Sequence, residues 1–371
     1  MRRFPSGMTA AALVLGLLLS FFLAEASVLL IVGEQPKFPR RVVEAPWGLR
    51  YNQPGAHYRH KSADMTAYFR INRQGMRADE DYTYEKPPGI RRIVALGDSF
   101  TIGYEVDHDS SFPSVLGERL RENGFEVQVL NAGVSGFSSA EELLYLEREL
   151  IKYDPDVVLI NFFGNDLVDN IRNNLFVLRD GKLIEKRTRY VPQGRLGNFL
   201  NSNWLFNLLS GYSNSFVLVK ERLTRLAKAN MVAENQRNLD QAMTSEPTKA
   251  DRDPSSTGGA GKGRREYQER LTAAIFERLY AFTRERDVPL IIHSIPFGGL
   301  TPGRMRDVFP IEHFEVDRPG LHFFRSMEVL APHEGKQSLM WGRSHFHWTP
   351  FSHRVVGEEL AEIILRERYF D

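Results

Sequence analysis

Two short stretches hold residue types that together could cleave or form an ester bond. The first, "GDSFTIGY", presents Ser99 on a glycine-flanked turn directly after an apolar run. The second, "GRSHFHWTPFSH", from Gly342 to His353, offers three histidines. A serine hydroxyl activated by a histidine base is a common arrangement for nucleophilic acyl transfer. Taken alone, the first stretch also fits an ordinary turn in which Asp98 and Ser99 cap a helix.

The carboxylate that usually completes such a pair does not stand beside any of the three histidines. In serine hydrolases an acid accepts the ring N–H of the histidine and fixes the useful tautomer. If His347 is a base, something else must hold its ring.

The elements that must position these residues alternate between short apolar strands and amphipathic helices, which predicts a parallel α/β sheet. We expect strands at 92–96, 127–131, 157–161 and 288–294. Helices are expected to begin near 111 and 138, and a last helix to run from 353 to 369. Each predicted strand ends in polar or glycine-rich residues, and open α/β sheets present reactive groups at that end.

A long insertion is expected between the third and fourth strands, at about 174–268. It begins with a hairpin at 174–187 around Asp180-Gly181 and continues with one or two amphipathic helices between 198 and 228. Residues 244–265 are polar and rich in Ser, Gly and Pro, so they are predicted to form a disordered loop. The apolar cluster around Trp204 fits an acyl-binding lid, a membrane-facing patch or a local core.

The N-terminus is predicted to be a signal anchor at 1–34, followed by one catalytic domain at 35–371. An uncharged apolar run from Met8 to Ala24 and a second run at 26–33 are together long enough to cross a bilayer. Ala24-Glu25-Ala26 also has the small-x-small form of a signal-peptidase site, which would release a secreted protein. The apolar continuation favours the uncleaved anchor, and the short N-terminus favours an extracytoplasmic domain.

Composition excludes several other classes of function. The formal net charge is +1 and no basic stripe is interleaved with aromatic residues, so a nucleic-acid partner is not expected. Cysteine is absent, which rules out disulfides, thiolate metal sites and a cysteine nucleophile.

Four blocks in order resemble those of the SGNH hydrolases, also called GDSL esterases. They are "GDSFTIGY", "NAGVSG", "FFGNDLVDN" and the histidine segment near the C-terminus. The lead-in "YFRINRQGMR" is similar to that of bacterial membrane-anchored members, and "HWTP" resembles a segment of enzymes that O-acetylate polysaccharides. The resemblance implies a three-layer, flavodoxin-like α/β sandwich behind one N-terminal transmembrane helix.

The resemblance also assigns roles by position. Ser99 matches the nucleophile, and its backbone N–H matches one oxyanion donor. The Gly133 N–H and the Asn165 side chain match the other two donors, and His347 matches the base. No cofactor is expected.

Alternatives for the histidine segment remain open. His345 could be the base, and the spacing of His345, His347 and His353 does not exclude a zinc site, although no carboxylate ligand stands with them. Family members carry an Asp two or three residues before the base, where this chain has His345 and Ser344. We expect His347 to be steered by the Ser344 hydroxyl, by a backbone carbonyl, or by a distant acid such as Glu334.

The predicted protein is a serine hydrolase acting on ester bonds, anchored in the inner membrane and facing the periplasm. The resemblance implies that it removes or transfers an O-acyl group, first of all acetyl, on an envelope or extracellular carbohydrate. Hydrolysis of lipid or short-chain esters is the alternative. A rival from another class is a catalytically impaired protein with the same fold that binds glycan or a partner protein.

Overall fold

Five parallel strands form the central sheet of the computed structural model, which describes residues 7–39, 41–192, 194–224, 259–344 and 346–370. The strands are β5 (Arg91–Leu96), β6 (Val127–Asn131), β7 (Val157–Phe163), β10 (Leu290–Ile295) and β11 (Leu321–Arg325). Their spatial order is β11-β10-β7-β5-β6, and each neighbouring pair is parallel. Numbered along the chain this is 5-4-3-1-2, the flavodoxin-like order, with its switch point between β5 and β7. The predicted α/β fold with a central parallel sheet is confirmed.

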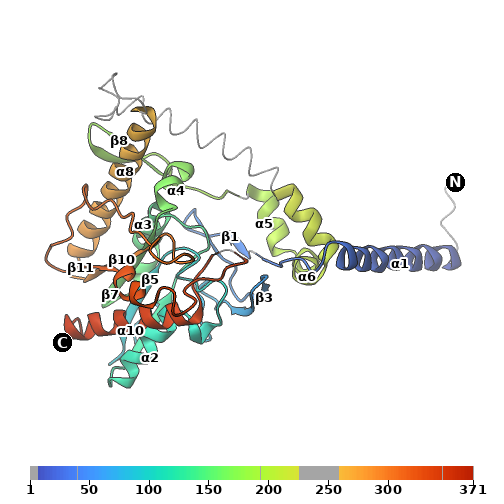
Figure 1. The fold of residues 1–371 in the computed structure, drawn as a ribbon, viewed down its shortest axis with the longest axis horizontal. Helices are drawn as coiled ribbons and strands as arrows, with labels where there is room; N and C mark the ends of the chain where they lie inside the picture. The colour runs from blue at the N-terminus through green and yellow to red at the C-terminus, as the bar shows by residue number, and fades with distance from the viewer. Residues whose placement is uncertain (1–6, 40, 193, 225–258, 345, 371) are drawn as a thin grey trace.

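Two helical layers cover the sheet because successive strand side chains point to opposite faces. Val94 and Leu96 of β5 belong to the core beneath α3 (Ser139–Arg148) and α8 (Gly259–Arg284), on the side that also carries α4 (Asp166–Asn173). Ile93 and Ala95 belong to the opposite core, beneath α2 (Phe112–Glu122) and α10 (Pro350–Arg366). The three layers are visible in Figure 1.

Most predicted elements exist, with shifts at their ends. Helix α3 is preceded by a capping box between Ser138 and Glu141. The last helix begins at Pro350 rather than at 353, because proline suits the first helical turn and Thr349 stands at the N-cap. Strand β11 was not predicted. It is a short edge strand that is only half-buried, so its sequence lacks the strong apolar run of the central strands.

The insertion starts with the predicted hairpin, formed by β8 (Phe176–Arg179) and β9 (Lys182–Glu185). Asp180 and Gly181 both have positive φ, 51° and 74°, as a type I′ turn requires. The predicted disordered loop at 244–265 lies mostly outside the described residues. The predicted C-terminal end of this loop, residue 265, is wrong, because α8 already begins at Gly259. Arg265 is within this helix and pairs with Glu269 one turn later.

Three helices of the insertion form what we call the helical platform, residues 194–224. They are α5 (Gly194–Ser202), α6 (Trp204–Tyr212) and a helix over residues 214–224. The platform is tied to the main body of the chain by hydrogen bonds such as that from Asn201 Nδ2 to the Val42 carbonyl at 2.8 Å. Figure 1 shows α5 and α6 between the central sheet and α1.

Two antiparallel hairpins precede the central sheet and were not predicted. The first joins β1 (Val42–Glu44) to β2 (Arg50–Asn52), and the second joins β3 (His57–Lys61) to β4 (Thr66–Arg70). Phe69 of β4 packs in a small core with Ile102 and Tyr104. The second hairpin therefore supports the turn that follows β5. Four short helical turns complete the described elements: η1 (His108–Ser110), η2 (Leu150–Tyr153), α9 (Ser326–Leu330) and η4 (Ala331–His333).

Helix α1 (Gly7–Ile31) extends away from the body. It is 25 residues long, its most apolar window has a mean hydropathy of 2.4, and none of that window is buried. By length and composition this helix can cross a membrane, and a signal sequence would have the same properties.

Candidate active site

The topological switch point brings the first and third sequence blocks together. Ser99 follows β5 and Asn165 follows β7, and these strands are neighbours in the sheet. The chain after β5 folds into consecutive tight turns, in which the Tyr104 N–H donates to the Ser99 carbonyl at 2.9 Å. This places a half-buried serine at the carboxyl edge of the sheet, where such folds bind ligands.

His347 meets this serine from the far end of the chain. Its Nε2 lies 2.8 Å from the Ser99 Oγ, and its side chain is nearly buried between the rings of Phe100 and Tyr104, each 5.1 Å away. The Trp341 N–H donates to the His347 carbonyl at 2.8 Å, which holds the segment in place. A serine and a histidine at hydrogen-bond distance form the nucleophile–base geometry.

A carboxylate lies behind the imidazole, and it comes from Glu105. Glu105 Oε2 is 3.4 Å from His347 Nδ1, and the Glu105 residue is fully buried. A carboxylate there favours the tautomer with hydrogen on Nδ1, which leaves the unprotonated Nε2 facing the Ser99 hydroxyl. Serine, histidine and glutamate thus line up as a three-residue relay.

Two of the predicted partners of His347, Ser344 and Glu334, make other contacts. The Ser344 hydroxyl donates to Asp64 Oδ2 at 2.8 Å, and Glu334 Oε2 accepts the Gly303 N–H at 2.9 Å. His345, the alternative base, lies outside the described residues. The sequence did not point to Glu105 as the partner of His347, although Glu105 follows Ser99 by only six residues. The available signal was a lone glutamate between the apolar neighbours of "IGYEV".

The backbone at Glu105 is strained, with φ at +66°. A non-glycine residue in this left-handed region costs on the order of 1 kcal/mol, and such strain clusters at functional sites. The Trp341 indole N–H donates to the Glu105 carbonyl at 3.0 Å, so the loop that carries His347 also holds the acid.

Arg77 binds the backbone of the turn that runs from Ser99 to Val106. Its guanidinium is buried and donates to the carbonyls of Ile102, Gly103 and Val106, at 2.8, 2.6 and 2.8 Å. It also lies 4.0 Å from the centre of the Phe69 ring. Burial lowers the pKa of Arg77 to about 10, which leaves it protonated at neutral pH. Arg77 belongs to the lead-in "QGMR", and it fixes the path of the residues that end at Glu105.

Gly133 packs directly against the turn that begins at Ser99, which we call the nucleophile turn after its proposed role. A Cβ at this position would lie 2.4 Å from the Ile102 nitrogen, so only glycine fits. The Gly133 N–H donates to Asn131 Oδ1 at 3.2 Å, and Asn131 Nδ2 donates to the Thr101 carbonyl at 2.9 Å. The second block is therefore joined to the turn that begins at Ser99.

Asn165 stands at the N-cap of α4, half-exposed at the same edge of the sheet. Its Nδ2 lies 3.4 Å from Asp169 Oδ2, and its side chain also interacts with the Asp98 carboxyl. This amide is the third predicted oxyanion donor. Gly164 before it is confined as well, because a Cβ there would lie 2.2 Å from the Phe297 ring.

Several buried carboxyl groups lie near the turn that begins at Ser99. Burial is the main cause that raises the pKa of Asp98 to about 7, and it raises the pKa values of Asp166 and Glu142 well above their usual range. Asp98 accepts the Phe100 N–H at 2.9 Å, and Asp166 accepts the Ser139 hydroxyl at 2.7 Å. Protonated carboxyls beside the nucleophile turn make the folded state sensitive to pH.

Two further histidines near the site are core residues. His293 Nδ1 lies 2.7 Å from Asn161 Oδ1, and His353 Nδ1 accepts the Phe112 N–H at 3.2 Å. Both are fully buried, and burial lowers the pKa of each to about 3. They are neutral at any physiological pH, and their ring nitrogens facing these groups are already occupied.

The model of the GDSL-like lipase/acylhydrolase family matches residues 95–355, from the end of β5 into α10. The chain belongs to this family. The matched range includes all four sequence blocks and Glu105, which agrees with the predicted SGNH/GDSL resemblance.

Characterised GDSL relatives match a shorter segment. An arylesterase of Vibrio mimicus is 37% identical over 75 residues, which are 20% of this chain and 38% of the relative. The esterase TesA of Pseudomonas aeruginosa is 32% identical over 74 residues, 20% of this chain and 37% of the relative. The similarity thus spans less than two fifths of these relatives.

Solved GDSL-type structures superpose loosely. An acetylxylan esterase, Axe2, from Geobacillus stearothermophilus has 14% identity and a TM-score of 0.37, covering 76% of this chain and 95% of that one. LAE5, a hydrolase from the metagenome of Lake Arreo, has 13% identity and a TM-score of 0.38, covering 78% and 99%. Family membership rests on the sequence match, and the fold on the strand order.

Proposed function

We propose that this GDSL-family protein is a serine esterase that uses Ser99, His347 and Glu105. The observation that carries the proposal is the 2.8 Å contact between Ser99 Oγ and His347 Nε2, with the Glu105 carboxylate on the other ring nitrogen. A binding protein has no need for a nucleophile, a base and an acid in this order, so the geometry disfavours the non-catalytic alternative.

In the first half-reaction Ser99 Oγ attacks the ester carbonyl carbon while His347 Nε2 takes the hydroxyl proton. Glu105 stabilises the imidazolium that forms, because the ion pair exists only when His347 is protonated. The imidazolium returns the proton to the leaving alcohol, and the acyl group remains on Ser99. A second hydroxyl, from water or from an acceptor alcohol, then releases it by the same steps in reverse.

The negative charge on the carbonyl oxygen needs donors that are in place before the reaction. The Ser99 and Gly133 N–H groups and Asn165 Nδ2 are proposed for this role. The contacts from Gly133 N to Asn131 Oδ1 and from Asn165 Nδ2 to Asp169 Oδ2 are long, 3.2 and 3.4 Å, so a substrate oxygen can compete for these two donors.

An aromatic row beside the site is proposed to bind the acyl side. Phe100 lies 4.8 Å from Phe163, and Phe163 stacks on Phe297 at 4.6 Å. Phe163 and Phe297 are only partly buried, which leaves apolar surface next to Ser99. An acetyl group on an envelope or extracellular carbohydrate is the proposed substrate. The same surface also suits short-chain lipid esters.

The site is proposed to face the periplasm at the end of an uncleaved α1 anchor. The length and hydropathy of α1 support membrane insertion.

Initial rates on p-nitrophenyl acetate test the esterase proposal, using the full chain in neutral detergent. Ser99→Ala and His347→Ala are expected to lower kcat at least about 1000-fold. Acetylated xylo-oligosaccharides and a lysophospholipid then compare the two substrate classes, and added unacetylated glycan reveals acyl transfer. Wild-type rates equal to those of Ser99→Ala on every ester would refute the proposed esterase activity.

A further inference from the structure

A pocket of about 330 Å³ lies outside the catalytic site, between β3 and α6. Its walls include Arg41, His57 and Arg59 on one side and Trp204 and Tyr212 of α6 on the other. No Asp or Glu stands among the described residues that line it. The pocket therefore combines cationic groups with aromatic rings.

Its two arginines lack carboxylate partners within the described part of the chain. Arg41 lies 5.6 Å from the Tyr58 ring and makes no side-chain hydrogen bond there. Arg59 lies 5.2 Å from the Tyr212 ring and donates one hydrogen bond, to the Gly211 carbonyl at 3.2 Å. The Nε atoms of both are buried without a hydrogen-bond partner among the described residues. Guanidinium groups held in this way are suited to bind a phosphate.

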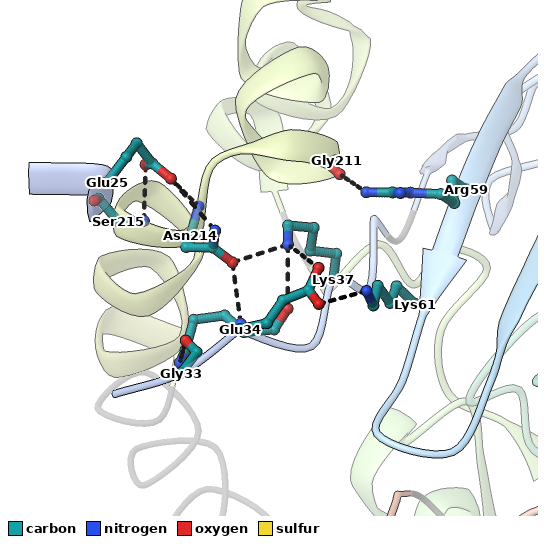
Figure 2. A network of polar contacts seen from close by, with 10 residues as sticks. Glu25, Gly33, Glu34, Lys37, Arg59, Lys61, Gly211, Asn214 and Ser215 are labelled. Carbon is teal, nitrogen blue, oxygen red and sulfur yellow. Dashed lines mark hydrogen bonds and ion pairs between the residues drawn. The ribbon is translucent and has the colours of Figure 1, made fainter. Parts of the chain in front are cut away.

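The pocket adjoins the helix that is proposed to cross the membrane. Glu25 of α1 accepts the N–H groups of Asn214 and Ser215, at 2.8 and 3.0 Å, and the Ser213 hydroxyl. These residues directly follow Tyr212, a wall of the pocket. Figure 2 shows Glu25 and Asn214 on one side of this network and the Arg59–Gly211 contact on the other. The pocket and α1 thus meet through one loop.

Lys37 and Glu34 close the network between α1 and the body. Lys37 Nζ donates to Asn214 Oδ1 at 2.9 Å and lies 3.5 Å from Glu34 Oε1. Glu34 also pairs with Lys61 of β3 (Figure 2). The contacts connect the end of α1 to the same β3 strand that supplies Arg59. They hold the pocket close to the end of the helix.

The platform exposes apolar side chains around the pocket. Trp204 is 73% exposed and Leu196 is 71% exposed, and Phe199 and Leu208 are also exposed. Exposed tryptophan and leucine on short amphipathic helices are typical of surfaces that lie in a membrane interface. Among the earlier alternatives for the Trp204 cluster, this exposure disfavours a local core.

We propose that the Arg41–Arg59 pocket binds the phosphate of an anionic phospholipid in the bilayer that holds α1. The inference rests on the proposed membrane anchoring and not on the esterase activity. A lipid headgroup is favoured over free phosphate because the pocket joins α1 and is bordered by exposed apolar groups of the platform. The bound lipid would fix the platform, and with it the catalytic body, against the membrane surface.

Native mass spectrometry of the full chain in neutral detergent tests the site. The protein is titrated with phosphatidylglycerol, with zwitterionic phosphatidylcholine and with inorganic phosphate. Wild type is expected to prefer phosphatidylglycerol, and Arg41→Gln/Arg59→Gln to weaken this binding at least about tenfold, because hydrogen bonds to charged groups contribute strongly. Arg179→Gln/Arg354→Gln removes two exposed arginines elsewhere and is the charge-matched control.

Equal binding of both lipids by wild type, or phosphatidylglycerol binding unaffected by the Gln pair, would overturn the proposal. So would inorganic phosphate competing the lipid away at equal concentration, which would assign the pocket to a soluble anion. If the Gln pair melts earlier without lipid, Arg41→Lys/Arg59→Lys decides the matter: it must keep the preference for the anionic lipid. Carbonate extraction of membranes tests anchoring separately.

Discussion

At the scale of single residues, the acid of the candidate relay is the most informative position. Glu105 combines a buried carboxylate, a left-handed backbone and a 3.4 Å approach to His347. It stands in the same turn as the nucleophile, so one short loop supplies both ends of the relay. The histidine alone comes from elsewhere.

Replacing this acid tests its role directly. Glu105→Gln keeps the shape but removes the charge that stabilises the imidazolium, so kcat is expected to fall about 100-fold to 10,000-fold with little change in KM. The measurement is p-nitrophenyl acetate hydrolysis at several pH values. Glu118→Gln on the exposed face of α2 is the control. An unchanged kcat for Glu105→Gln would remove Glu105 from the mechanism.

Gly133 gives a second prediction at this scale. In Gly133→Ala the new Cβ would press on the Ile102 backbone nitrogen, 2.4 Å away, and the turn has to move. Overpacking of this kind costs roughly 1–3 kcal/mol, and the moved donor should also lower kcat. Thermal unfolding and initial rates measure the two effects. Gly342→Ala, where no atom lies within 4 Å, should change neither, and equal behaviour of the two variants would contradict the packing argument.

The sequence was sufficient for some of these residues and insufficient for others. Ser99, Gly133, Asn165 and His347 stand in motifs with fixed local spacing, so they could be proposed from the chain alone. Glu105 could not, because its contact with a residue near the C-terminus depends on how two distant loops fold together. Arg77 was not singled out either, because an arginine in a loop between two strands is ordinarily a solvated residue.

At the scale of elements, the turn from Ser99 to Glu105 depends on Arg77, in the segment between β4 and β5. Arg77→Lys keeps the charge but loses the planar fork that reaches several carbonyls at once. We expect a lower melting temperature and a kcat reduced about tenfold, because the acid and nucleophile are no longer held in register. Calorimetry and initial rates check this. A stable variant with full kcat would show that Arg77 does not position the turn.

The raised pKa values of two buried carboxyl groups near the site, Asp98 and Asp169, determine an expected dependence of stability on pH. Burial raises the pKa of Asp98 to about 7 and that of Asp169 to about 6, so the folded chain binds protons more tightly than the unfolded one. Their stabilising contribution is complete below about pH 4 and is lost as the pH rises through 7. The melting temperature should therefore fall between pH 5 and pH 8.

Glu142 is the residue with which to test this dependence. It is fully buried, interacts electrostatically with Asp98 and Asp166, and neither of its carboxyl oxygens has a hydrogen-bond partner among the described residues. Glu142→Gln is expected to raise the melting temperature at pH 8, by about 2–4 °C for each kcal/mol recovered, and to leave it nearly unchanged at pH 5. The same gain at both pH values would mean that repulsion between these carboxylates is not the cause.

Element predictions succeeded where a strand is buried on both faces. Strands β5, β7 and β10 are buried along nearly their whole length and rich in apolar residues, which makes them distinctive. Strand β6, buried at three of its five positions, was also predicted. The missed elements are half-exposed: the edge strand β11 and the hairpins β1–β2 and β3–β4. Their side chains are mixed in character, so periodicity alone does not separate them from loops.

At the scale of the whole molecule, α1 and the helical platform are joined through Glu25. This carboxylate caps the helix over residues 214–224 by accepting two of its N–H groups. Composition predicted an anchor and an insertion separately. Their contact could not be foreseen, because the two segments are far apart in sequence.

Removing the cap should loosen this junction. Glu25→Leu leaves the Asn214 and Ser215 amides without their acceptor, so their hydrogen exchange is expected to accelerate in nanodisc-embedded protein. Glu118→Leu, on the exposed face of α2 far from this junction, is the control. Unchanged exchange of these amides in Glu25→Leu would argue against a rigid connection between anchor and platform.

The place of His347 in the chain also bears on when the proposed esterase would become active. Ser99, Glu105, Gly133 and Asn165 all belong to the first half of the chain, whereas the base lies just before the final helix. Chains fold from the N-terminus during synthesis, so the nucleophile turn can form while its base is still inside the ribosome. Hydrolytic competence of the proposed esterase would then arrive only with the last stretch of translation.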